Sequence, residues 1–181
     1  MYNYGSHYID KNDVTNIVKV LKGSFLTQGK LVETFENHIK SFIGCKHALA
    51  VSSGTAALHL ISKSLGWTDK DVILTSSITF AATVNSIIYS NSKPEFVDID
   101  NDDYSISPKD IEEKIISLKK KNKKVKALIV VDYGGQPAKW KEIYKLKKNI
   151  NFKLFQIIVI LMVQSIIIKN LMLHIMLIWF L

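Results

Sequence analysis

Short apolar runs alternate with helix-like stretches along most of this chain, and that alternation restricts the folds it can adopt. Runs at 47–51, 72–74, 95–98 and 125–131 have the length and composition of short strands, and the stretches between them carry apolar residues at helical spacing. Strands joined by helices favour a parallel sheet, because a parallel crossover needs roughly a dozen residues or more. The sequence therefore predicts an α/β fold, a mostly parallel sheet with helices on both faces.

Two amphipathic helices are expected before the sheet begins. Asp10 and Asp13 are typical of a capped helix start, and Gly23 is typical of a helix end. A second helix is expected over 31–42 with Gly44 as its stop, and the segment between the two helices is expected to be a loop. Four later positions also resemble helix starts: Ser53, Phe80, Ser107 and Pro137.

Length and composition narrow the possible functions. A chain of 181 residues suits one domain or slightly more, which is short for an enzyme that needs both a cofactor domain and a substrate domain.

Charge and individual residues narrow the possible partners. The net charge of +8 comes from lysine without any arginine, which weakens the case for a nucleic-acid partner. The lysine run 119–124 is expected to be a solvated helix end. Cys45 is the single cysteine and the histidines lack ligand spacing, so we expect no internal disulfide and no metal site. The polar segment 1–10 has no signal-peptide pattern, which predicts a cytoplasmic location.

The segment 52–55 (SSGT) is expected to link a strand to a helix. At such a turn, free backbone N–H groups and the positive end of the helix dipole form a natural cradle for a phosphate, and Gly54 permits a close approach. Serine and threonine at this place are more often simple helix caps. The turn alone therefore does not decide between phosphate binding and capping.

Several sequence blocks, in this order, resemble one family. They are VSSGTAALHL (51–60), ITFAATVNS (78–86), KPEFVDID (93–100), YSISPKDIEEKI (104–115) and VVDYGGQP (130–137), preceded by YID (8–10) and SFLTQG (24–29). Together they extend over most of the chain from residue 4 to about 154, and they resemble the DegT/StrS-type nucleotide-sugar aminotransferases, which depend on pyridoxal phosphate (PLP). VVDYGGQP and the N-terminal tyrosines look most like the pseudaminic-acid-pathway branch, which aminates a UDP-linked 4-keto-6-deoxy sugar.

This resemblance implies a set of site residues. Gly54 and Thr55 would bind the PLP phosphate, and Phe80 would stack on the pyridine ring and exclude water. Without the resemblance, Phe80 is more simply a core aromatic residue. The residues implied near the nucleotide-sugar substrate, which otherwise belong to a surface loop, are Tyr4, Leu26, Thr27, Gln28 and Gly29.

Three other polar residues have simpler roles. His59 follows the phosphate turn on the same helix, and we expect it to pack rather than to catalyse. Asp98 and Asp100 resemble a metal-binding pair, but at the end of a strand they are expected to cap the next loop.

The resemblance also implies a fold and an activity. The fold is the incomplete large domain of a fold-type I PLP aminotransferase. The activity is transfer of an amino group, with glutamate as the expected donor, to a keto sugar carried by UDP, in the synthesis of surface polysaccharide or flagellin glycan precursors. Members of the family build each active site from both subunits, so a homodimer is expected of the full-length enzyme. Neither nucleic acid nor a membrane is an expected partner.

The C-terminal segment departs from the family pattern. PLP aminotransferases need a Schiff-base lysine for the cofactor and an acid at the pyridine nitrogen, and the family has both after a strand expected to begin near Asn151. The segment 154–181 contains no acidic residue, no glycine and no proline. We therefore expect residues 1–154 to be a partial PLP-binding large domain and residues 155–181 an apolar tail. The chain is expected to be inactive, since an upstream lysine would have to replace the missing one: Lys30, Lys46 or Lys63.

Two hypotheses explain the tail. One is a membrane anchor, since about 20 apolar residues span a bilayer, although Lys169 and several amides interrupt the run. The other is a shifted reading frame. If each new codon takes the third base of one codon for residues 155–181 and the first two bases of the next, the codons can spell SDNCHSYGSKYNNKEFDASYYADLVF. This sequence resembles the family segment around the pyridine-nitrogen aspartate. Every codon choice for Met162 and Val163 regroups to glycine, and every codon choice for Trp179 and Phe180 regroups to valine. Other letters of the regrouped sequence depend on which synonymous codon is chosen. Loss of one base from an isoleucine codon just after Leu154 would suffice, and a tail translated out of frame is not expected to pack.

Proteins of other classes also fit the sequence. The main alternative is a cytoplasmic α/β binding module, for a nucleotide, that the apolar tail anchors to a membrane. A nucleic-acid-binding module is a third possibility, which the absence of arginine disfavours.

Overall fold

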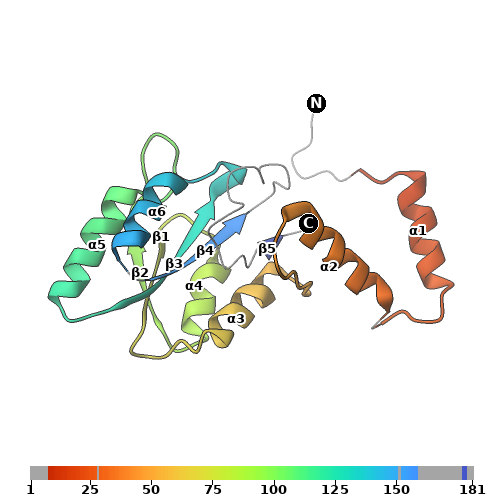
Figure 1. Cartoon of the computed structure of the whole chain (residues 1–181), viewed down its shortest axis with the longest axis horizontal. Helices are drawn as coiled ribbons and strands as arrows, with labels where there is room; N and C mark the ends of the chain where they lie inside the picture. Colours follow the sequence, from red (N-terminus) through yellow and green to blue (C-terminus); the bar gives the residue numbers. More distant parts are fainter. Residues whose placement is uncertain (1–7, 28, 151, 159–176, 179–181) are drawn as a thin grey trace.

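The computed structural model describes residues 8–27, 29–150, 152–158 and 177–178. Within these ranges the chain forms helices and strands in the alternating order that the sequence predicts (Figure 1). In chain order they are α1 (Lys11–Leu21), α2 (Lys30–Ile43), α3 (Gly54–Ser64), β1 (Val72–Ser76), α4 (Ala81–Ile88), β2 (Lys93–Val97), α5 (Pro108–Lys120), β3 (Val125–Asp132), the 3-10 turn η1 (Tyr133–Gly135), α6 (Trp140–Asn149), β4 (Lys153–Ile158) and β5 (Leu177–Ile178).

The strands form one sheet in the order β2-β1-β3-β4-β5, and each of the pairings is parallel. Strand β1 lies between β2 and β3, and all five of its residues are buried. The α/β fold with a parallel sheet is therefore confirmed.

Two helical layers cover the sheet, and the alternation of side chains along β3 divides its residues between them. Ala127, Ile129 and Val131 pack in one buried cluster with residues of α3 and α4, whereas Leu128 and Val130 pack in a second cluster with residues of α5 and α6. Burial on both faces explains why β3 is apolar without alternation from Ala127 to Val131. The helices on both faces confirm the expected layered architecture.

Local signals in the sequence account for the helix ends. Asp10 and Asp13 form a capping box at the start of α1, and Gly44 ends α2 with a left-handed φ of 73°. Ser107 caps α5 by accepting a hydrogen bond from the backbone N–H of Asp110. The lysine run begins in the last turn of α5, as expected, where a positive charge favours the negative end of the helix dipole.

Two expectations about secondary structure are wrong. The run 47–51 is not a strand, because it has no hydrogen-bonded neighbouring strand in the described part of the chain, and Leu49 within it is 77% exposed. Helix α6 begins at Trp140, three residues after Pro137. Lys139 has a non-helical ψ of 61°, and the backbone N–H of Trp140 donates to the carbonyl of Ala138, so a tight turn precedes the helix.

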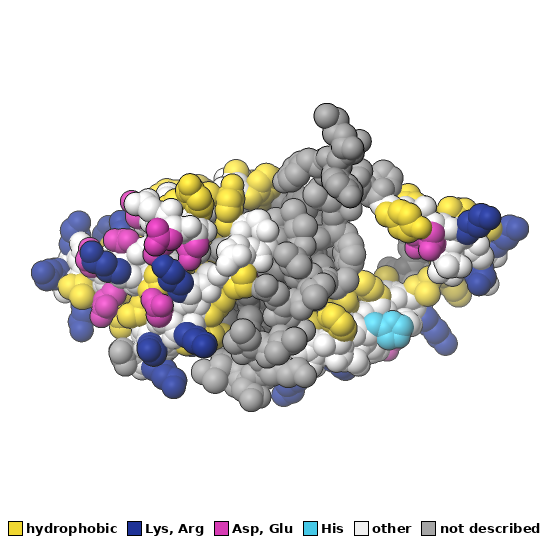
Figure 2. All heavy atoms as spheres, turned by 90° about the horizontal axis from the view of Figure 1, so that it is seen from above, with side chains coloured by type: hydrophobic (Ala, Val, Ile, Leu, Met, Phe, Trp, Pro, Cys, Tyr) yellow, Lys and Arg dark blue, Asp and Glu magenta, His cyan; other side chains and the backbone are white. Residues whose placement is uncertain are grey.

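Helices α1 and α2 extend to one side of the sheet as an arm, residues 11–43 (Figure 1). Neither helix has a buried residue, and Figure 2 shows apolar side chains on the surface of the arm. The opposite end of the molecule, around α5, carries lysines interspersed with acidic residues. Large apolar side chains of the arm are exposed: Val14, Ile17, Leu21, Leu31, Phe35 and Phe42.

The expected apolar tail lies mostly outside the described residues. Its first four residues continue β4 beyond Leu154, and their backbone pairs with β3 up to Ile158. None of the helices in the described part of the chain combines the length and the apolar character needed to cross a membrane.

One charged cluster joins loops that are far apart in sequence. The Lys139 ammonium group contacts the Asp100 carboxylate and lies 3.8 Å from Asp103 Oδ2. The hydrogen bond from Lys139 lowers the pKa of Asp100, and the same hydrogen bond raises the pKa of Lys139. The cluster therefore ties the loop after β2 to the segment that precedes α6.

We predict that D100N lowers the stability of the folded chain at neutral pH. A carboxyl group whose pKa is lowered by folding stabilises the fold above its unfolded pKa, and this contribution is lost as the pH falls through the lowered value. The difference between D100N and the native chain in urea denaturation should therefore shrink below about pH 4. The matched control is E113Q, which removes an exposed helical ion pair with Lys109 and should have little effect. A difference that persists unchanged in acid would contradict this account.

Candidate functional site

The turn before α3 has the geometry of an anion cradle. The Ser53 hydroxyl accepts a hydrogen bond from the backbone N–H of Ala56 at 3.1 Å, and the Ser53 carbonyl accepts one from Ala57 at 3.0 Å. No described residue accepts a hydrogen bond from the backbone N–H groups of Gly54 and Thr55, which are the first two of the helix. Unpaired N–H groups at the positive end of a helix dipole attract a phosphate.

Phe80 lies directly before α4, and the loop that carries it is held by hydrogen bonds. The Ser76 hydroxyl donates to the carbonyl of Ile78 at 2.6 Å, and Thr83 donates its backbone N–H to the carbonyl of Phe80 at 2.9 Å. Phe80 is 65% exposed, so it is not the core aromatic residue that composition alone suggests. An exposed aromatic ring on a well-held loop can cover a planar ligand.

The fold brings the turn and Phe80 to the same edge of the sheet. Helix α4 leads from the carboxyl end of β1 to the amino end of β2, and the two strands are parallel. Helix α3 leads to the amino end of β1 and packs against α4. Both helices therefore run in the same direction, with their N-termini at the carboxyl edge of the sheet.

Strands β1 and β3 mark the point where the chain reverses its direction across the sheet. After β1 the chain moves outward to β2 through α4 on one face, and after β3 it moves the opposite way to β4 through α6 on the other face. In open α/β sheets, ligands bind in the crevice outside the carboxyl ends of two such strands. The Phe80 loop and the turn after β3 thus flank the expected crevice.

Asp132, at the end of β3, organises the far side of this crevice. It is 4% exposed, and its Oδ1 atom accepts hydrogen bonds from the Ala138 backbone N–H and from the Trp140 indole N–H, each at 3.0 Å. Between these residues, Gly134 and Gly135 adopt φ values of 58° and 82°, which only glycine adopts readily. Sequence analysis did not single out Asp132, although an aspartate between an apolar run and a Gly-Gly pair was a usable signal.

A second residue that sequence reasoning missed is Glu36 of α2. Its Oε1 atom accepts a hydrogen bond from the backbone N–H of Ala50 at 2.8 Å. The contact ties the arm to the segment that leads into the phosphate turn. No local pattern could reveal it, because the two residues are 14 apart in sequence and belong to different elements.

Of the residues expected near the substrate, the three that the structure describes are not gathered with the phosphate turn. Leu26, Thr27 and Gly29 lie in the loop between α1 and α2, at the end of α2 that is remote from α3 (Figure 1). Leu26 is 68% exposed. Tyr4 and Gln28 lie outside the described residues.

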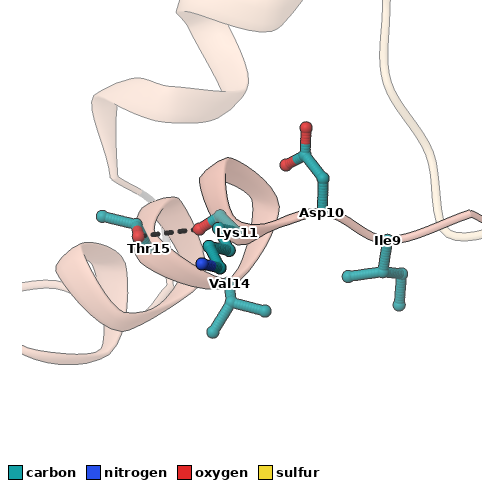
Figure 3. A pocket seen from close by; sticks show the side chains of 5 residues that line it. All are labelled: Ile9, Asp10, Lys11, Val14 and Thr15. Carbon is teal, nitrogen blue, oxygen red and sulfur yellow. Dashed lines mark hydrogen bonds between the residues drawn. The ribbon is translucent and has the colours of Figure 1, made fainter.

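The hollow shown in Figure 3 is not part of this edge of the sheet. It is lined by residues at and just before the start of α1, where the Thr15 hydroxyl donates to the carbonyl of Lys11 at 2.7 Å. None of the sequence-predicted site residues lines it. We assign it no function.

The three other polar residues have the expected simple roles. The ring of His59 packs edge-on against Tyr89, with centroids 5.4 Å apart. Asp98 and Asp100 accept hydrogen bonds from the backbone N–H groups of Ile99 and Asp102. All three residues are thus explained by packing or by loop capping.

The residues present fit a PLP phosphate and an aromatic cover, but Lys30 and Lys63 lie at helix positions far from the cradle. Lys63 is in the last turn of α3, nine residues after Gly54, so it lies roughly 13 Å away along the helix axis. Lys30 begins α2, at the end remote from α3, and Lys46 lies in the chain reversal after α2.

Known proteins share this sequence and this fold. A UDP-4-amino-4,6-dideoxy-N-acetyl-β-L-altrosamine transaminase from Campylobacter jejuni is 39% identical over 154 residues, which are 85% of this chain and 40% of the relative. Helicobacter pylori PseC, an aminotransferase involved in pseudoaminic acid biosynthesis, is 32% identical with a TM-score of 0.76 over 86% of this chain and 40% of its own. A GDP-4-keto-6-deoxy-D-mannose-3-dehydratase from E. coli with bound hydrated PLP is 26% identical with a TM-score of 0.76, over 86% of this chain and 41% of its own.

These similarities bear on a part of each relative, since the chain spans about 40% of their length. The family match itself extends over residues 7–156 and so includes the phosphate turn, Phe80 and the whole of β3. By this match the chain belongs to the DegT/DnrJ/EryC1/StrS aminotransferase family.

Proposed function

We propose that this chain carries the phosphate-binding and ring-covering part of a PLP-dependent aminotransferase that acts on a nucleotide-linked keto sugar. The observation that carries the proposal is the pair of unpaired N–H groups of Gly54 and Thr55 at the same sheet edge as the exposed ring of Phe80. PLP, when bound, supplies the electron sink for amino transfer. Gly54 and Thr55 would hold its phosphate, and Phe80 would cover its ring and exclude water.

The proposed substrate is a UDP-linked 4-keto-6-deoxy sugar, with glutamate as the amino donor. Support comes from the blocks that resemble the pseudaminic-acid branch and from the Campylobacter jejuni relative, whose name states a UDP-sugar transaminase. The E. coli relative is a dehydratase on a GDP-linked sugar with the same fold, so fold similarity alone does not select the sugar. The product would serve surface polysaccharide or flagellin glycan synthesis.

The first test measures phosphate-dependent binding with pyridoxamine 5′-phosphate. This compound keeps the phosphate and the ring, but it lacks the aldehyde that would react with any of the 24 lysines. Equilibrium dialysis of the purified chain should show binding that pyridoxamine, without the phosphate, does not match. T55V should weaken binding by about fivefold, the effect of one hydrogen bond.

The matched control is T15V, which makes the same change on α1, where the hydroxyl donates to the carbonyl of Lys11. It should leave the affinity unaltered. Equal binding of pyridoxamine and its phosphate would contradict the assignment of the phosphate turn.

We also propose that the functional form is a homodimer. The loop 24–29 lies remote from the phosphate turn of its own chain, and the arm exposes large apolar side chains that water disfavours. A second subunit would cover the arm and could bring Leu26 and Thr27, with Tyr4 and Gln28, to the site of its partner. The expected cytoplasmic location and the membrane-anchor alternative both stay predictions.

The dimer predicts a defined change when the arm is made polar. Sedimentation velocity of the purified chain should show a species of twice the monomer mass, and I17K with F35K should yield monomer because charges would be buried in the interface. V51K is the control, since it adds a charge at an exposed apolar position outside the arm. A native chain that stays monomeric at high concentration would rule out self-association of this form.

The register of β4 supports a shifted reading frame in the tail. With the isoleucine codon restored after Leu154, the aspartate of SDNCH stands at position 157 in place of Ile157. The backbone of Ile157 pairs with Val131. Paired residues of a parallel ladder point to the same face, and Val131 packs on the face that α3 and α4 cover. The aspartate would therefore face the helices that carry the phosphate turn and Phe80. We propose that residues 155–181 are out of frame and that the chain in this form does not complete a transamination.

We predict that this chain, treated with PLP and then borohydride, shows no stoichiometric label at a single lysine. Restoration of one base after Leu154 should produce a chain with one fully labelled lysine downstream, and a more soluble product, because apolar surface that was not selected to pack favours aggregation. Peptide mass mapping measures both results. A single stoichiometric adduct with turnover in the unrestored chain, or an early stop in the restored frame, would disprove the frame hypothesis.

A further inference from the structure

Helix α2 and the segment that follows it form a compact reversal. Gly44 turns the chain with its left-handed φ of 73°, and the backbone N–H groups of Gly44 and Cys45 both donate to the carbonyl of Lys40. The Cys45 thiol lies 3.2 Å from the carbonyl of His47. The segment 45–50 therefore returns along α2.

The carboxylate of Glu36 marks where this return ends. It accepts the backbone N–H of Ala50 at 2.8 Å. Glu36 lies seven residues before Ile43, the last residue of α2, which is about 10 Å back along the helix. Because the run 47–51 has no hydrogen-bonded strand beside it in the described ranges, this carboxylate takes the place of a strand neighbour for Ala50.

The contact lies close to the phosphate turn. Gly54 follows Ala50 by four residues, and Val51, Ser52 and Ser53 between them are exposed. On its far side the turn is held by Ser53, which caps α3. On its N-terminal side, the hydrogen bond from the Ala50 backbone N–H to Glu36 holds the segment that leads into the turn.

We infer that Glu36 is a positioning residue for the cofactor phosphate, acting through the backbone of Ala50. By holding Ala50 against α2, Glu36 restricts the conformations of the turn that leads to the N–H groups of Gly54 and Thr55. This inference rests on the proposed function, since it assigns a residue that orients the same site.

Charge and position predict opposite effects for loss of the carboxylate. A negative side chain near an anion cradle repels the phosphate, so removal of its charge alone should strengthen binding. Loss of an anchor should weaken binding, because the turn then samples other conformations. The sign of the change therefore separates the two roles.

The test compares E36A with E36Q and E33A by equilibrium dialysis with pyridoxamine 5′-phosphate. Gln keeps an oxygen that can accept the Ala50 N–H, and Glu33 is an exposed carboxylate on the same helix. E36A should bind about tenfold more weakly, the loss typical of a hydrogen bond to a charged group. E36Q, which keeps the acceptor and loses the charge, should bind as tightly as the native chain or slightly more tightly, and E33A should remain near the native affinity. Amide hydrogen exchange at Ala50 should accelerate in E36A and stay slow in E36Q.

Each outcome has a clear meaning. Native affinity in E36A, or equal loss in E36Q and E33A, would overturn the positioning role. Absence of phosphate-dependent binding by the native chain would overturn the proposed function, and the positioning role with it. Circular dichroism of E36A checks that the helices remain folded. If E36A fails to fold, weaker binding by E36Q, which keeps the acceptor for Ala50, would overturn the inference.

Discussion

The parallel pairing of β1 with β3 is the interaction on which the rest of the structure depends. These two strands are buried on both faces, and their ladder joins Ile73 to Ala127, Leu74 to Leu128 and Thr75 to Ile129. Two helical layers pack on the apolar side chains that alternate along them. The same pairing sets the crevice, because the chain leaves β1 and β3 in opposite directions at their carboxyl ends.

The candidate site is built from backbone as much as from side chains. The N–H groups of Gly54 and Thr55 are available because they begin a helix, and Asp132 and Glu36 act through the amides of Ala138 and Ala50.

The arm contrasts with the sheet in its physical state. Helix α1 begins with a capping box and α2 ends at Gly44, yet neither helix has a buried residue in the described part of the chain. Helix caps and helical periodicity make the local structure, whereas burial of those side chains requires a surface that the described part of the chain does not offer. The arm therefore depends on further protein surface in a way that the sheet does not.

The sequence by itself determined the local elements of this protein. Asp10, Gly44 and Ser107 predicted helix ends correctly, and the apolar runs predicted β1, β2 and β3, because caps and periodicity act within a few residues. Tertiary structure decided what depends on distant partners. The run 47–51 has strand-like composition but no neighbouring strand in the described ranges, and α6 begins only at Trp140, after the non-helical ψ of 61° at Lys139. The tie from Glu36 to Ala50, across 14 residues, likewise forms only when the chain reverses after α2, and no local pattern encodes such a contact.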